Sequence, residues 1–331
     1  MNNQLRLTVT PSPHLHSKES VSNAMRDVFI ALIPITLVSV YIYKSYALLL
    51  IGVCLAMAAL TELLFRKIRR QRATLNDGSA MVTGLLVALC FSPGTAWWTA
   101  ALAVFIGIGL AKELMGGLGW NRYNPALFGR LSVILLIPIF HQVTYVFSPL
   151  KQDFGSVDVL TQATPLALMI QGSGYPSLLQ MFLAHQGGSL GETAALALLI
   201  GGLYLLYKKH ITWHTPLSVI AAVVVMALLF GTNLLGAGAP LYHLLGGGVL
   251  LGAFFMATDW VTSPITPTGK IIFGASIGIL LMVFRLFLAP TEGMAFSILI
   301  MNAFVPLIDR YTKRLKFGEI KKSATETVMG T

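Results

Sequence analysis

A polar segment, DVLTQATP at residues 158–165, interrupts a chain that is otherwise mostly apolar. Thr164 before Pro165 is typical of a helix start, because a threonine hydroxyl accepts from free N-terminal amides and proline is tolerated at the first helical position. The free amides and the positive dipole end of such a helix also favour a phosphate. We therefore expect a helix to begin here and a phosphoryl group to be favoured close to Thr164.

Three further polar segments lie where apolar helices are expected to enter the membrane: residues 75–84, 116–130 and 255–270, called here the polar boundary segments. Each combines glycine or proline with Asn, Asp, Thr or Arg. A helix broken in this way exposes backbone groups, which membrane proteins tolerate where these are buried in protein or face water or a polar ligand. A ligand site and ordinary turn and capping chemistry are equal alternatives here. The candidate ligand residues are Asn76, Asp77, Asn121, Asn124, Asp259 and Thr262.

Several charged residues fall within or beside apolar segments, where insertion of a charge costs about 2.5–3.5 kcal/mol. For Lys112, Glu113 and Lys270 we favour an interpretation in which the side chain reaches along the helix to water at its end. For Arg285, which lies deeper, this interpretation and a functional role are equally open.

Other motifs predict no catalytic residue and no metal site. The sequence GIGLAK at residues 107–112 ends an apolar helix and follows no strand, which excludes a dinucleotide loop. His210 and His214 are four residues apart but have no carboxylate beside them, so we do not expect metal binding. Cys54 and Cys90 are expected to be small apolar residues in packed helices, with no iron-sulfur or zinc site.

The composition predicts an all-α polytopic membrane protein. The chain has 331 residues, of which 55% are hydrophobic and 11% charged, and several apolar runs approach the twenty or so residues that cross a bilayer. A soluble domain would carry roughly a quarter charged residues, and a spanning barrel would alternate. The net charge of +10 falls mostly between apolar segments and at the C-terminus, as expected of cytoplasmic loops rather than of a nucleic-acid-binding surface.

About ten transmembrane helices are predicted, with boundaries good to a few residues. They lie near residues 27–43, 46–65, 79–92, 97–115, 124–147, 193–207, 216–232, 241–257, 270–289 and 293–309.

The basic segments predict the orientation of these helices. RKIRRQR at residues 66–72 is the densest cluster and marks a cytoplasmic loop, and residues 112–122, residues 208–210 and the C-terminal tail then fall on the same side. Both termini are therefore expected inside, and the long loop that carries Thr164 outside. The polar first twenty residues predict no cleavable signal.

A single integral membrane domain is expected, in two halves of opposite orientation with five helices each. The segments GSAMVTGLL and GGGVLLGAF, each opening the third helix of its half, are a weak internal repeat. The expected parts are a cytoplasmic segment 1–26, a first half 27–147, an external loop 148–192, a second half 193–310 and a cytoplasmic tail 311–331.

Residues 158–164 resemble a flavinylation sequence, Asp-x-x-Ser/Thr-Gly-Ala-Ser/Thr, in which FMN is esterified through its 5′-phosphate to the last hydroxyl. SPHLHSKESV, GGLGWNRYNPA and GAFFMATDWVTSP resemble the same family, so the resemblance covers most of the chain. The chain is similar to the D subunit of Rnf-type ion-translocating electron-transport complexes. That subunit is related to the B subunit of the sodium-pumping NADH:quinone oxidoreductase. The early start of the membrane region favours the Rnf type. Gln162 and Trp260 depart from the family pattern, which more often has glycine and proline there.

The resemblance implies that Thr164 carries FMN and that Asp158, Thr161 and Ala163 complete the motif read by a flavin transferase. It implies a place in the bacterial cytoplasmic (inner) membrane, with the FMN loop periplasmic. The partners it implies are another FMN-bearing subunit, iron-sulfur subunits and membrane lipid, but no nucleic acid. The complex would couple electron transfer to movement of Na⁺ or H⁺.

The family also implies a second, non-covalent flavin such as riboflavin nearer the cytoplasm, for which the polar boundary segments are the candidate region. The alternative function is a solute channel or transporter with inverted repeats and no redox cofactor. That alternative predicts solute flux without bound flavin, and it leaves residues 158–164 without a role.

Overall fold

The computed structural model describes side chains and backbone for residues 20–71, 75–136, 177–184, 187–230, 240–287 and 293–312, and the backbone alone for 137–144 and 239. Within these ranges the chain is helical and contains no strand. The segment with Asp158, Thr161, Gln162, Ala163 and Thr164 lies outside the described residues.

The first group of helices follows the predicted order, and local capping explains where several begin. Ser20 caps the first helix by accepting from the Asn23 amide, and Asn124 caps the fifth, with Pro125 at its first position. The elements are α1 (Val21–Tyr43), α2 (Ser45–Ile68), a short 3₁₀ turn η1 (Leu75–Asp77), α3 (Ser79–Cys90), α4 (Trp97–Ile106) continued by a π-helix η2 (Gly107–Glu113), and α5 (Pro125–Thr144).

The second group contains one helix that the sequence did not predict and one that is broken. The elements are α7 (Leu178–Leu183), η5 (Leu190–Glu192), α8 (Ala195–Tyr207), α9 (His214–Phe230), α11 (Ala239–Leu245), α12 (Val249–Leu251) continued by a π-helix η7 (Gly252–Met256), α13 (Pro267–Phe287) and α14 (Gly293–Tyr311). The short α7 starts with a capping box between Ser177 and Gln180, a signal that was readable in the sequence.

The single helix predicted over residues 241–257 is wrong, because α11 and α12 are separate. Gly247 and Gly248 adopt φ values of 64° and 68°, in the left-handed region that glycine occupies most readily. The break leaves the Gly246 and Gly247 carbonyls without helical partners, and Arg285 donates to both.

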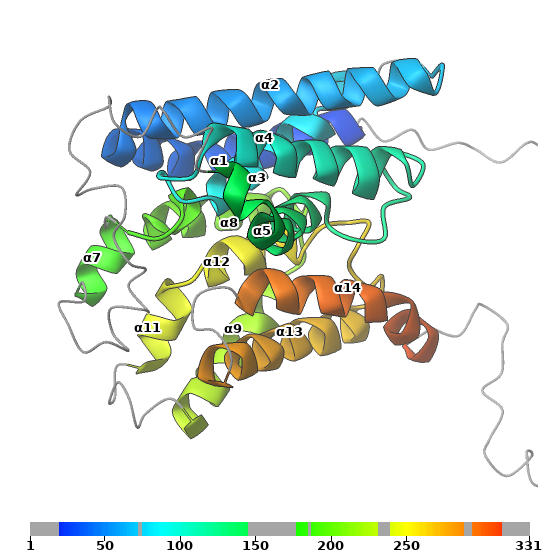
Figure 1. Cartoon of the computed structure of the whole chain (residues 1–331). Coiled ribbons are helices and arrows are strands. Elements are labelled where there is room, and N and C mark those ends of the chain that lie inside the picture. The colour runs from blue at the N-terminus through cyan, green and yellow to red at the C-terminus, as the bar shows by residue number, and fades with distance from the viewer. Residues whose placement is uncertain are drawn as a thin grey trace, which may run out of the picture.

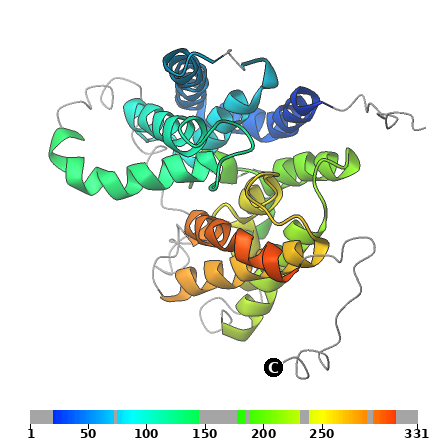
Figure 2. The same ribbon diagram turned by 90° about the vertical axis from the view of Figure 1, so that its right-hand side faces the viewer.

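Four described helices, α1, α2, α13 and α14, are each long and apolar enough to cross a membrane, and α3, α8 and α9 are shorter apolar helices. Apart from the broken segment 241–257, each predicted apolar helix overlaps a helix in the described part of the chain, whereas the count of ten spans stays a prediction. Figures 1 and 2 show α1–α4 on one side of the molecule, α9, α13 and α14 on the other, and α5, α8 and α12 between them. The most extensive packing joins α9 to α13, α13 to α14, α2 to α3 and α1 to α8.

The starts of α3 and α12 share two features. Each follows a left-handed glycine, Gly78 or Gly248. Each also has a buried cation beside it, supplied by a neighbouring helical segment of the same predicted half: Lys112 in η2 donates to Ser79, and Arg285 in α13 donates to the Gly247 carbonyl. This is the pattern expected of a duplicated unit, although the two inverted halves stay a prediction.

Candidate functional site

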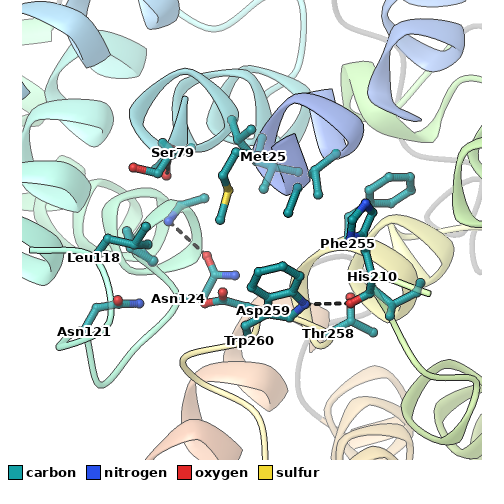
Figure 3. Close-up of a pocket in the computed structure, with 18 of the residues that line it drawn as sticks. Met25, Ser79, Leu118, Asn121, Asn124, His210, Phe255, Thr258, Asp259 and Trp260 are labelled. Atoms are coloured by element: carbon teal, nitrogen blue, oxygen red, sulfur yellow. Dashed lines mark hydrogen bonds between the residues drawn. The ribbon is translucent and has the colours of Figure 1, made fainter. Parts of the chain in front are cut away.

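A cavity of about 90 Å³ lies where α1, α3, the start of α5, the end of α8 and the π-helix η7 meet. All three polar boundary segments contribute to its wall (Figure 3), although they are far apart in the sequence. Its polar lining residues are Ser79, Thr83, Lys112, Asn121, Asn124, His210, Thr258 and Asp259, and its larger apolar ones include Met25, Leu118, Phe254, Phe255 and Trp260.

Asn124 joins three of the segments around the cavity. Its side-chain oxygen accepts from the Ala126 and Leu127 amides at the start of α5, and its Nδ2 donates to the Met256 carbonyl at 3.2 Å. The side-chain amide of Asn302 in α14 satisfies its neighbours when its oxygen and nitrogen are exchanged. In that orientation the Asn302 side-chain oxygen accepts from the Asn124 backbone amide at 3.1 Å. Asn124 is therefore held by both of its polar groups, which leaves it a positioning role.

Asp259 and Thr262, both predicted as candidates, form one unit in the turn after η7. The Thr262 hydroxyl donates to Asp259 Oδ2 at 3.0 Å, and the backbone amides of Val261 and Trp260 also donate to this carboxyl group. Desolvation raises the pKa of the Asp259 carboxyl above its ordinary value, and these hydrogen bonds offset only part of that rise. Asp259 lines the cavity, whereas Thr262 does not line it and instead orients the Asp259 carboxyl group.

The side chains of Lys112 and Glu113 do not reach water. The expectation that they extend along the helix to water at its end is therefore wrong. Lys112 is 1% exposed, and its ammonium donates to Glu62 Oε2 at 3.0 Å and to Ser79 Oγ at 2.6 Å. Glu113 is also buried and pairs with Arg66, whose Nε lies 2.8 Å from Glu113 Oε2. Each buried charge has an opposite charge beside it, which offsets the loss of hydration.

Arg285 is buried too, held by carbonyls of the α11–α12 break. Lys270 is half-buried and donates to Thr212 Oγ1.

Asn76 and Asp77, the remaining predicted candidates, do not line the cavity. Asp77 Oδ1 accepts from the amide and the hydroxyl of Ser79, at 2.8 and 2.7 Å. The Asn76 carbonyl accepts from Ser22 of α1. These residues hold the start of α3 in place, so that Ser79 accepts from Lys112 while donating to Asp77.

The sequence analysis missed the pairing of His210 with Asp27 and expected no carboxylate beside this histidine, which the structure shows to be wrong. His210 Nε2 lies 2.7 Å from Asp27 Oδ2, the Tyr204 hydroxyl donates to Asp27 Oδ1 at 3.0 Å, and the Trp260 indole donates to the His210 carbonyl at 2.6 Å. An acid inside the first apolar helix was the available signal. His214 instead stacks on Trp213, with the ring centroids 4.1 Å apart, so the two histidines have different partners.

The residues that line the cavity suit a planar heteroaromatic ring, but the cavity as it stands is too small to hold one. Phe254, Phe255 and Trp260 supply apolar and aromatic surface, and Asn121 Oδ1 is buried with no partner among the described residues. Small-molecule pockets usually offer about 300 Å³ or more. A ring therefore enters only if side chains move, and Met25, which has three rotatable bonds, and Trp260, which is 50% exposed, both face the space in Figure 3.

These features define a helical membrane protein with broken helices and buried ion pairs around an internal polar site. The chain belongs to the NQR2, RnfD, RnfE family, whose sequence profile matches residues 8–318.

Relatives from several bacteria match almost the whole chain. The chain is 40% identical over 328 residues to the D subunit of the Na⁺-translocating ferredoxin:NAD⁺ oxidoreductase complex of Acetobacterium woodii, covering 97% of this chain and 99% of the relative. It is 40% identical over 323 residues to the D subunit of the proton-translocating ferredoxin:NAD⁺ oxidoreductase complex of Clostridium ljungdahlii, covering 94% and 96%. The D subunit of the ion-translocating oxidoreductase complex of Aliivibrio salmonicida is 34% identical over 346 residues, with 95% and 99% covered.

Proposed function

We propose that this chain is the D subunit, a membrane component, of an Rnf-type ion-translocating oxidoreductase complex. In this role it relays electrons through FMN held on Thr164 and helps to couple electron transfer to Na⁺ or H⁺ movement. The observation that carries the proposal is similarity along nearly the full length to subunits of that name, together with the motif at residues 158–164.

The Thr164 hydroxyl is the proposed attachment point. A flavin transferase would join the Thr164 oxygen to the phosphorus of the FMN half of FAD, with AMP as the leaving group and the hydroxyl proton released. Asp158, Thr161 and Ala163 would complete the recognised motif. FMN, when bound, supplies one-electron and two-electron redox chemistry, and the tether keeps its local concentration high near partner cofactors.

The cavity beside Asn121 is the proposed place for a second, non-covalent flavin such as riboflavin. Asn121 and Asp259 would meet the polar edge of its ring, and Phe254, Phe255 and Trp260 would cover its faces. The buried Asn121 oxygen, which has no partner among the described residues, supports this assignment, since a buried acceptor without a donor is costly.

The proposed orientation places both termini in the cytoplasm and the FMN loop in the periplasm of a bacterial inner membrane. Arg66, Lys67, Arg69 and Arg70 end or follow α2, and they lie at the end of the bundle where Arg66 and Arg69 contact Glu113. Positive residues concentrate on the cytoplasmic side of membrane proteins. The proposed partners are the other subunits of the complex, including another FMN-bearing subunit and the iron-sulfur subunits.

The coupling ion is proposed only as Na⁺ or H⁺. The relatives from Acetobacterium woodii and Clostridium ljungdahlii are equally similar to this chain but are named for different ions. Overall similarity therefore does not select between the two ions.

Covalent flavin tests the proposal directly. Wild-type protein from cells that contain the transferase should fluoresce under ultraviolet light after denaturing electrophoresis, and Thr164→Val should abolish the signal because it removes the acceptor oxygen. Thr161→Ser, which keeps the Ser or Thr that the motif has at this position, should keep the band fluorescent. A mass spectrum of the Thr164 peptide should show the added FMN. A dark wild-type band, with solute flux from the purified chain in liposomes, would instead support a channel or transporter.

A further inference from the structure

A basic pocket of about 400 Å³ opens at the end of the molecule where α9 and α13 begin. Lys209 and Lys270 line it together with Thr212. Lys209 is exposed, and Lys270 is half-buried and donates to Thr212 Oγ1 at 3.2 Å. Neither lysine forms an ion pair within the described part of the chain. The starts of two long helices add their positive dipole ends, so this pocket favours an anion.

An apolar groove of about 440 Å³ continues directly from this pocket along α9 and α13. The two cavities follow each other along both helices: Thr212 and Lys270 line the basic pocket, and the next residues, Trp213 and Ile271, line the groove. The remaining groove residues are His214, Leu217, Ser218, Ala221, Ala222, Val225, Met226, Ala275 and Ile279.

Small residues explain why the groove exists. A Cβ added at Gly278 would lie 2.6 Å from Ala222 Cβ, so α9 and α13 are in close backbone contact there. Figure 1 shows these helices side by side at the side of the molecule away from α2. Larger side chains flank the contact, and Leu217 and Ile279 are 53% and 45% exposed. The groove therefore faces outward, toward whatever surrounds the protein in the membrane.

We propose that this pocket and groove together bind an anionic phospholipid, with its phosphate between Lys209 and Lys270 and an acyl chain along α9 and α13. Unpaired lysines at one end of an apolar groove match a negative head joined to hydrocarbon. Trp213, stacked on His214 between the two parts, is a residue typical of the boundary between headgroups and acyl chains. A helix of a partner subunit is the competing occupant, but a hydrophobic helix would leave the two lysines without an anion.

The test uses the full chain in its native assembly, purified in mild detergent and mixed with dioleoyl phosphatidylglycerol or dioleoyl phosphatidylcholine before native mass spectrometry. The wild type should retain the phosphatidylglycerol preferentially. Lys209→Gln with Lys270→Gln should lower that preference roughly 10- to 30-fold, because both charges near the phosphate are lost. Lys67→Gln with Arg70→Gln removes two exposed cations elsewhere and should leave it unchanged.

Occupancy of the groove is tested separately. Ala221→Trp should reduce retention of both lipids by filling the groove, while a phosphatidylglycerol with a photoreactive acyl chain should label peptides of α9 and α13 in the wild type. Equal retention of the two lipids by the wild type, or equal preference in the two double variants, would overturn the proposal. A photoreactive residue at position 221 that cross-links to another subunit instead of lipid would overturn it in favour of a protein interface. These readouts measure lipid and do not depend on flavin content.

Discussion

Lys112 shows how a single buried residue organises the end of the bundle beside the cavity. Its ammonium bridges Glu62 of α2 and Ser79 of α3, and Ser79 in turn donates to Asp77. The chain of contacts fixes the start of α3 against α2 and places Ser79 in the cavity wall. A charge that the sequence suggested was at the membrane surface is therefore part of the interior.

We expect Lys112→Met to destabilise the protein by about 3–5 kcal/mol, because it leaves the Glu62 carboxylate buried without its cation. The double variant Glu62→Gln with Lys112→Met should recover part of this loss. Thermal unfolding of the detergent-solubilised protein measures both. Lys208→Met is the control, since this lysine is largely exposed and 3.8 Å from Asp27, and should change stability by about 1 kcal/mol or less. If Lys112→Met lowered the stability no more than the control variant does, the structural role of Lys112 would be contradicted.

Asn121 is the residue whose replacement should test the proposed non-covalent flavin. In a Thr164→Val background, where covalent FMN is absent, Asn121→Leu should lower flavin affinity roughly tenfold by removing a hydrogen bond to the ring. Acid extraction and chromatography measure the remaining flavin. Asn76→Leu makes the same change at an exposed position outside the cavity and should keep the background content. Equal flavin content in the two variants would argue against this cavity as the flavin site.

At the scale of elements, broken helices create the polar interior. The π-helices η2 and η7 both end beside the cavity, where Lys112 and Phe255 line it, and π-helical turns are often found at functional sites. The break between α11 and α12 also creates a polar site in the interior, near Arg285. There the carbonyls released by the helix accept from a buried guanidinium. In each case an interrupted helix is stabilised by a side chain from a neighbouring one.

Gly247→Ala should disrupt the α11–α12 break. Its φ of 64° costs an alanine about 1–2 kcal/mol, and the added Cβ would also collide with the Arg285 guanidinium. Gly52→Ala in α2 is the matched control, because its Cβ would meet nothing within 4 Å and alanine favours a helix. We expect a lower midpoint of thermal unfolding for Gly247→Ala and an unchanged or higher one for Gly52→Ala. The opposite order would show that the break tolerates a side chain.

At the scale of the whole molecule, orientation in the membrane would decide on which side each proposed flavin lies. The proposed orientation is open to a labelling test, because both cysteines, Cys54 and Cys90, are buried. A cysteine introduced on the surface would therefore be the reactive one.

Leu179→Cys in α7 should react with a membrane-impermeant maleimide in cells whose outer membrane has been permeabilised, since Leu179 is exposed and lies in the loop proposed to be periplasmic. Lys67→Cys at the end of α2 should react only after the inner membrane is opened. The reverse pattern would invert the topology and place Thr164 in the cytoplasm, where the proposed transferase could not reach it.

Local sequence signals predicted the positions of most helices, because a long apolar run is a local feature of the chain. The glycine break between α11 and α12 was missed. Local signals also selected the polar boundary segments, and Asn121, Asn124 and Asp259 from these line one cavity. Asn76 and Asp77 were selected by the same rule but support Ser79 instead. A type of residue at a helix boundary does not reveal whether its side chain caps its own helix or faces a shared space.

The sequence by itself determined that this is a helical membrane protein, and its motif and family resemblance pointed to the D subunit of an Rnf-type complex. Apolar length and composition alone require helices in a bilayer, and residues 158–164 act as a contiguous signal. Only the tertiary structure decided that Lys112, Glu113 and Arg285 are buried rather than at the surface, that His210 pairs with Asp27, and that a basic pocket adjoins an apolar groove. The hydrogen bonds of these buried groups join residues 33 to 183 positions apart in the chain, and contacts at such separation exist only once the helices have packed.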